Sequence, residues 1–213
     1  MAQGNPRSYD SSRRKAAAAA TRHRILGEAR RLFIERGYEA TTIAAIAAAA
    51  GVAPDTVYAT VGRKPVLFRL LVEAAISGTS EAVPALEREY VRRVRASTVA
   101  AEKLDLYAHA ITAVQERLAP LFLVLREAAP AHPELGQLWH EIGERRAQNM
   151  RMFAADMAAT GMLRPGVEVE ELADVVWTTN SAELYSLFVF ERGWPPARFA
   201  AWLSAAWRRL FLD

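Results

Sequence analysis

The sequence predicts an all-α fold, divided into a small N-terminal domain and a larger helical domain. Apolar residues recur at helical spacing over nearly the whole chain, and no segment sustains the period of two that a half-buried strand requires. Beyond Gly62 this pattern is interrupted by residues that we expect to break or start a helix: Pro84, Pro120, Pro130, Pro133, Gly161, Pro165, Gly166, Gly193, Pro195 and Pro196. The chain has 213 residues and no cysteine. It is therefore long enough for two unequal domains, and it offers no disulfide, no thiolate metal site and no cysteine nucleophile.

Residues 1–20 are expected to form a flexible basic arm, because the first twelve are polar and show no period. From Thr21 to Arg36 apolar side chains recur at helical spacing. Gly37 follows at the position where a left-handed residue commonly ends a helix. This segment is the first predicted helix.

Two short helices joined by a tight turn are predicted next. Thr41 or Thr42 can cap the first of them, which stops at Gly51. Pro54 suits the first position of the second, and Gly62 its end. This arrangement suits a helix-turn-helix, although small residues also occur at helix crossings in any helical bundle.

Beyond Gly62 the chain is predicted to be helical almost throughout, and residues 67–213 form the larger domain. The predicted helices run roughly over 65–77, 80–97, 100–118, 120–129, 133–160, 169–191 and 195–211. The last two carry wide apolar faces that need a partner, either within the chain or on a second copy.

The distribution of charged residues divides the chain into the same two parts. Residues 1–64 carry 11 Lys or Arg and 5 Asp or Glu, whereas the remainder carries 16 and 19. A basic N-terminal part indicates a polyanionic partner, although an ordinary solvated charge distribution would have the same composition. The sequence shows neither the apolar stretch of a signal peptide nor that of a membrane span, so we expect a cytoplasmic protein without membrane contact.

A run of about fifty residues, 24–74, resembles the N-terminal domain of TetR/AcrR-like transcriptional regulators. The matching elements are a basic helix ending in ERGYEATTI, an IAxxAGV turn, a T-[VL]-Y helix centre, and a glycine, basic pair and xLF that open a fourth helix. Ala53 and Val61 depart from the pattern, since a capping serine and an aromatic residue are usual there. The resemblance implies a helix-turn-helix DNA-binding domain over residues 21–66, with its second short helix in the major groove.

The resemblance also implies roles for particular residues. DNA contacts are expected from Thr42, Pro54, Asp55, Thr56, Tyr58, Ala59 and Lys64. Thr42, Tyr58 and Lys64 would contact phosphates, and the other four would face the bases. Tyr58 as a half-buried core residue and Lys64 as a solvated lysine remain alternatives. Residues 13–15, Arg-Arg-Lys, either follow the adjacent groove or make no fixed contact.

For the larger domain, the resemblance implies a repressor that binds a palindromic operator as a homodimer, through helices about 169–191 and 195–211, and is released by a small, largely apolar effector. Methionine and aromatic side chains suit an adaptable apolar pocket, with Asn180 as a polar anchor, although each can instead belong to the core. The candidate ligand-binding residues are Tyr107, Phe122, Trp139, Met150, Phe153, Met157, Trp177, Asn180 and Tyr185.

Two other functions remain open. The chain could be an all-α small-molecule-binding or metal-dependent enzymatic domain with an incidental basic N-terminus, or a DNA-binding regulator controlled by a protein partner. Asp105 with His109 and His140 with Glu144 have i, i+4 spacing, but neither histidine follows a glutamate by three positions as helical di-metal sites require. We interpret both pairs as surface contacts. No G-x-S-x-G elbow or Walker loop occurs, so we predict no catalytic residue, no metal and no cofactor.

Overall fold

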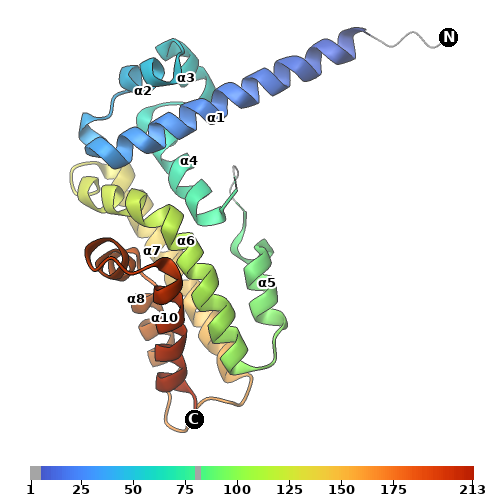
Figure 1. Cartoon of the computed structure of the whole chain (residues 1–213), viewed down its shortest axis with the longest axis vertical. Helices are drawn as coiled ribbons and strands as arrows, with labels where there is room; N and C mark the ends of the chain where they lie inside the picture. The colour runs from blue at the N-terminus through green and yellow to red at the C-terminus, as the bar shows by residue number, and fades with distance from the viewer. Residues whose placement is uncertain (1–5, 80–82) are drawn as a thin grey trace, which may run out of the picture. The chain divides into compact units, whose positions relative to one another are not determined.

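Figure 1 shows a computed structural model of the chain, which describes residues 6–79 and 83–213. The described residues form helices and connecting turns without any strand, which confirms the predicted all-α class. They divide into two compact units, Met1–Leu71 and Val72–Asp213. The division falls inside α4 (Lys64–Ser77), slightly later than the predicted domain boundary.

The N-terminal unit contains α1 (Pro6–Ala40), α2 (Ile43–Ala50), α3 (Pro54–Val61) and the first half of α4. Its core contains fully buried apolar side chains from all four helices: Ile25, Ala29, Phe33, Ile46, Val57, Leu67 and Phe68. The ring of Phe33 stacks on Tyr38, at 5.7 Å between centroids, and meets Phe68 edge-on at 4.9 Å. Aromatic packing therefore joins the end of α1 to α4.

The predicted flexible arm differs from the structure, because α1 already begins at Pro6. Alanine has the highest helix propensity of any residue type. The helix therefore extends through the run of five alanines before Thr21, although their side chains are exposed. Residues 1–5 of the predicted arm lie outside the described residues. Gly37, with φ of 76°, kinks the other end of α1 where the sequence predicted a helix end.

In the C-terminal unit, α6 is the central helix and packs against α5, α7, α9 and α10, while α8 packs against α7 (Figure 1). The elements are η1 (Ala85–Glu87), α5 (Glu89–Ala96), α6 (Ala100–Ala128), α7 (Pro133–Ala158), α8 (Val169–Thr179), α9 (Ala182–Ser186), η2 (Leu187–Glu191) and α10 (Pro196–Phe211). Within the described ranges, no single helix is both long and apolar enough to cross a membrane. Among the helices of these ranges, α2 and α3 pass such a test when taken together, across a bend of 100°.

Three predicted helices differ from those observed. Pro120 lies inside α6, which continues because Leu118, Leu121 and Phe122 are all buried and their packing offsets the lost hydrogen bond. The predicted helix over 169–191 is divided into α8, α9 and η2, because the side chain of Ser181 caps a new helix by accepting from Leu184 N–H at 3.2 Å. Residues 80–82 of the predicted helix over 80–97 lie outside the described residues, and its remainder forms η1 and α5.

Candidate DNA-binding surface and ligand cavity

The turn between α2 and α3 has the geometry of a helix-turn-helix. The two helices are bent by 100°, within the 90–120° typical of this motif. Gly51 adopts the left-handed conformation, with φ of 65°, and Val52 N–H donates to the carbonyl of Ala47 at 3.0 Å. Val57 of α3 is fully buried and packs back on the small core. The turn thus exposes the opposite face of α3.

The threonines before α2 have different roles. Thr42 is exposed and caps the helix, because its Oγ1 accepts from Ala45 N–H at 3.1 Å. Thr41 is fully buried, and its hydroxyl donates to the carbonyl of Gly37 at 2.8 Å. The sequence left the choice of cap open, and the structure assigns it to Thr42.

The exposed face of α3 carries the residues that were expected to meet DNA. Pro54, Asp55, Tyr58 and Ala59 are exposed and Thr56 is partly exposed. Half of the surface of Tyr58 is accessible, so this side chain is not part of the core. Ala53 provides no side-chain cap, and Asp55 is the acidic residue in the first turn of α3. A carboxylate at this position is favoured by the helix dipole.

Lys64 is held in place at the start of α4. Its Nζ lies 4.1 Å from the centroid of the Tyr38 ring and donates to the carbonyl of Glu39 at 3.4 Å. Partial burial lowers the pKa of Lys64, although the charge of Glu39 opposes this. The ammonium is therefore positioned by a cation–π contact rather than freely solvated.

The C-terminal unit contains a cavity of about 780 Å³ among η1, α5, α6 and α7. Four predicted ligand-binding residues line it: Tyr107, Met150, Phe153 and Asn180. Asn180 Nδ2 donates to Tyr107 Oη at 2.9 Å and to Met150 Sδ at 3.1 Å. Burial raises the pKa of Tyr107 strongly, so its hydroxyl stays protonated and can donate. We call this cavity the central cavity.

Known proteins resemble both units. Residues 25–69 match the family model described as bacterial regulatory proteins, tetR family. The N-terminal unit is therefore similar to the tetR family of bacterial regulatory proteins. No curated protein matches the chain.

Solved structures resemble the chain over most of its length. NalD, the secondary repressor of the MexAB-OprM multidrug efflux pump in Pseudomonas aeruginosa, has 20% identity and a TM-score of 0.70, covering 93% of this chain and 98% of its own. The fatty acid degradation regulator FadR from Bacillus halodurans has 17% identity and a TM-score of 0.70, covering 88% and 94%. The ketosteroid transcriptional regulator KstR2 of Mycobacterium tuberculosis has 17% identity and a TM-score of 0.62, covering 90% and 95%. At these identities the likeness concerns the fold.

Five other candidate ligand-binding residues do not line the central cavity. Phe122 and Trp139 stack on each other, at 4.6 Å between centroids, and Met157 is fully buried in the core. Trp177 is partly exposed on α8, and Tyr185 packs edge-on against Phe199. Apolar character alone could not distinguish them, because core and cavity side chains have the same composition.

The sequence analysis missed three polar residues that line the cavity, Gln115, Arg146 and Asp156, and Lys103, which bonds to Asp156. A signal was available for two of them. Lys103, Tyr107, Ile111 and Gln115 succeed one another at i, i+4 spacing, so they share one face of α6. Lys103 and Gln115 are thus polar residues on an apolar stripe, which predicts buried hydrogen-bonding groups.

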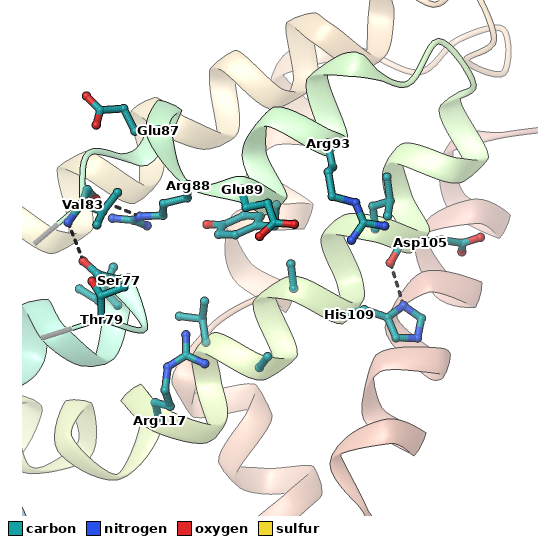
Figure 2. Close-up of a pocket in the computed structure, with 16 residues that line it drawn as sticks. Ser77, Thr79, Val83, Glu87, Arg88, Glu89, Arg93, Asp105, His109 and Arg117 are labelled. Atoms are coloured by element: carbon teal, nitrogen blue, oxygen red, sulfur yellow. Dashed lines mark hydrogen bonds between the residues drawn. The ribbon is translucent and has the colours of Figure 1, made fainter. Parts of the chain in front are cut away.

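A second pocket, of about 850 Å³, lies between the end of α4, the η1–α5 segment and α6 (Figure 2). Figure 2 shows His109 Nδ1 paired with the backbone oxygen of Asp105, at 2.8 Å. The Asp105 carboxylate accepts from Ser204 Oγ and pairs with Arg208 at 3.4 Å. Among the described residues no cluster of three or more His, Asp or Glu is arranged to hold a metal ion.

Proposed function

We propose that this TetR/AcrR-like protein is a cytoplasmic transcriptional repressor without catalytic activity, which binds a palindromic operator as a homodimer and is released by a small effector. The bend of 100° between α2 and α3, with Tyr58 exposed opposite the buried Val57, carries the DNA-binding part of this proposal. Repression is supported by the likeness to NalD, which is a repressor.

The DNA contacts follow from the exposed groups on α2, α3 and α4. Thr42 presents a hydroxyl at a helix N-terminus, where free backbone N–H groups favour a phosphate. Tyr58 can donate its phenolic hydrogen, and Lys64 supplies a positioned charge. These three groups would set the register on the duplex. The exposed side chains of the first turn of α3, Pro54 and Asp55, together with Thr56 and Ala59, would then meet base edges.

The homodimer is supported by large apolar side chains that remain exposed on the last helices. Trp177, Leu187, Phe190 and Leu210 are each between 37% and 50% accessible. They lie on α8, η2 and α10, where the sequence predicted the dimer interface. A two-fold dimer would place two copies of α3 about 34–36 Å apart and so prefer a palindrome.

The effector site is the central cavity, whose volume of about 780 Å³ suits a small organic molecule. Tyr107, Met150, Phe153 and Asn180 would contact the ligand. Binding there would change the spacing of the two DNA-binding units in the dimer and so weaken operator affinity.

Fluorescence anisotropy with labelled DNA tests the proposal. The protein should prefer its own upstream region to random DNA at about 0.15 M salt, and affinity should fall steeply as salt rises. Tyr58→Phe and Lys64→Ala should each weaken binding to all sequences, by roughly 2- to 10-fold, and Lys64→Ala should also reduce the salt slope by about one. Arg151→Gln, an exposed change on α7, is the matched control and should alter neither.

Light scattering tests the dimer, since the particle mass should be twice the 23.5 kDa of one chain. Phe190→Ser should shift the particle towards the mass of one chain, because it removes an exposed apolar contact. The absence of any preference for the upstream region, with folded protein, would lead us to abandon the repressor function.

A further inference from the structure

The charged groups that line the central cavity do not cancel one another. Both of its carboxylates are already paired: Glu73 Oε1 with Arg145 at 2.7 Å, and Asp156 Oδ2 with Lys103 at 2.6 Å. Arg88, Arg95 and Arg146 also line the cavity. Among the described residues, none of these three arginines has a carboxylate within ion-pair distance. The cavity therefore carries an excess of positive charge.

Arg146 is the arginine best placed to hold a ligand. Its Nη2 donates to the carbonyl of Trp177 and to Asn180 Oδ1, both at 2.7 Å, and its guanidinium lies 4.9 Å from the centroid of the Trp177 ring. These partners are neutral, and they leave Nε and Nη1 as donors for a ligand. The charge of Glu183 favours the charged form of Arg146, but the Glu183 carboxylate lies 3.7 Å from Arg126 Nη1.

Burial lowers the pKa of Arg146, although Tyr107 and Glu183 oppose this shift. A desolvated guanidinium with neutral partners gains more from an incoming anion than a solvated one does, because the desolvation has already taken place during folding. The stacked Trp177 ring and Asn180 fix the plane of the guanidinium before any ligand arrives.

Gln115 adds a second requirement for the ligand of the central cavity. It is 3% exposed and lines the same cavity. Its Nε2 donates to the backbone carbonyl of Asn180 at 2.5 Å, whereas its Oε1 accepts no hydrogen bond from any described residue. Asn180 is thus bonded to Arg146 through its side chain and to Gln115 through its backbone. A donor site for an anion and an unfilled acceptor therefore lie at the same end of the cavity.

The remaining lining is mostly apolar. Its members from η1, α5, α6 and α7 include Leu86, Val91, Val94, Ile111, Leu118 and Phe153. We propose that the effector is an amphipathic organic anion, whose carboxylate or sulfonate group binds Arg146, whose apolar body packs on this lining, and whose N–H or O–H group donates to Gln115 Oε1. This inference rests on the proposed ligand response and specifies the chemical class of the ligand.

Two fluorescent probes with the same apolar body test the charge requirement. Anilinonaphthalene sulfonate is an anion with an N–H donor, and N-phenylnaphthylamine is its neutral counterpart. The anionic probe should bind the full-length protein at least about tenfold more tightly, with one site per chain, because a hydrogen-bonded charge contact contributes about that much. Arg146→Gln should weaken the anionic probe by roughly 10- to 100-fold and the neutral probe by less than about threefold. Arg146→Lys keeps the charge and should retain most of the preference.

Arg151→Gln removes an exposed charge from the same helix, outside the cavity, and should leave both affinities unchanged. Equal binding of the two probes to the wild-type protein overturns the inference without any variant, so a poorly folded Arg146→Gln protein cannot hide the answer. An unchanged probe preference in folded Arg146→Gln overturns it as well. If neither probe binds, both this inference and the proposed ligand response through the cavity are refuted. Operator binding by the ligand-free protein is measured separately and is not affected by that result.

Discussion

Replacing Lys103 by methionine tests how the helices around the central cavity are held together. Lys103 is 2% exposed, and its Nζ donates to Asp156 Oδ2 at 2.6 Å and to the carbonyl of Val94 at 2.9 Å. One ammonium on α6 thereby joins α5 and α7. Lys103→Met keeps the length of the side chain and removes both bonds.

The magnitude follows from what each substitution leaves behind. Removing one partner of a buried ion pair costs about 3–5 kcal/mol when the remaining charge stays buried. After Lys103→Met the remaining charge is Asp156, which is 32% exposed and can be hydrated, so we expect a loss of about 2 kcal/mol. After Asp156→Asn the remaining charge is the buried ammonium, so the loss should reach about 3–5 kcal/mol. The acidic residue is the more exposed partner and yet the more costly one to change.

Urea unfolding followed by circular dichroism, at one fixed protein concentration, measures both losses. The corresponding drops in Tm are about 4–8 °C for Lys103→Met and about 6–20 °C for Asp156→Asn. The double variant Lys103→Met with Asp156→Leu should be more stable than Asp156→Asn alone, because it leaves no uncompensated charge. Arg31→Gln, which breaks exposed pairs with Glu28 and Glu35, should not shift Tm measurably. Equal losses for the two single variants, or the reverse order, would refute the reasoning.

Three further predictions concern the turn, the helix start and the buried tyrosines. Gly51→Ala should cost about 1–2 kcal/mol of stability in urea unfolding, because φ of Gly51 is 65°. Gly27→Ala in α1 should instead stabilise the protein, because nothing lies within 4 Å of the new Cβ. Similar effects of the two variants would refute the conformational cause. Asp55→Ala should be tested by anisotropy with single-base operator variants. If the carboxylate reads DNA, the variant should lose discrimination at one base pair. If the carboxylate only supports the helix, binding should weaken uniformly and Tm should fall by roughly 1–3 °C. Burial raises the pKa of Tyr185 to about 12 and that of Tyr107 further, so absorbance at high pH should show both still protonated at about pH 11. Because the raised pKa values favour the protonated tyrosines of the folded state, the stability of the protein should fall between about pH 10 and 12. Full ionisation of both tyrosines at pH 11 in the folded protein would contradict the burial of these rings.

The helix-turn-helix could be predicted from the sequence because its determinants are local. Gly51 supplies the left-handed turn, Thr42 caps α2, and Pro54 begins α3, each within a few residues of the backbone groups that it serves. The spacing of apolar residues then decides which face of each helix is buried. The exposure of Tyr58 agrees with that periodicity.

Longer helices were predicted less well, because tertiary packing competes with local signals. Pro120 usually ends a helix, but burial of Leu121 and Phe122 keeps α6 continuous. Conversely, the apolar run over 169–191 contains no strong breaker, and it is divided at Asn180, whose amide bonds to Tyr107 and Arg146. The start of α1 differed for another reason, since the propensity of the alanine run outweighed the polar character of the residues before it.

The sequence by itself determined the helical class, the helix-turn-helix and the residues that α3 exposes, because those properties depend on neighbours within one or two turns. Only the tertiary structure decided which aromatic side chains line the central cavity and which pack in the core. Its polar framework joins residues far apart in the chain: Lys103 with Asp156, and Asn180 with Gln115 and Arg146. Such partners are selected by the three-dimensional packing of α6 against α5, α7 and α9, since the energy of a buried charge depends on what surrounds it and not on its sequence neighbours.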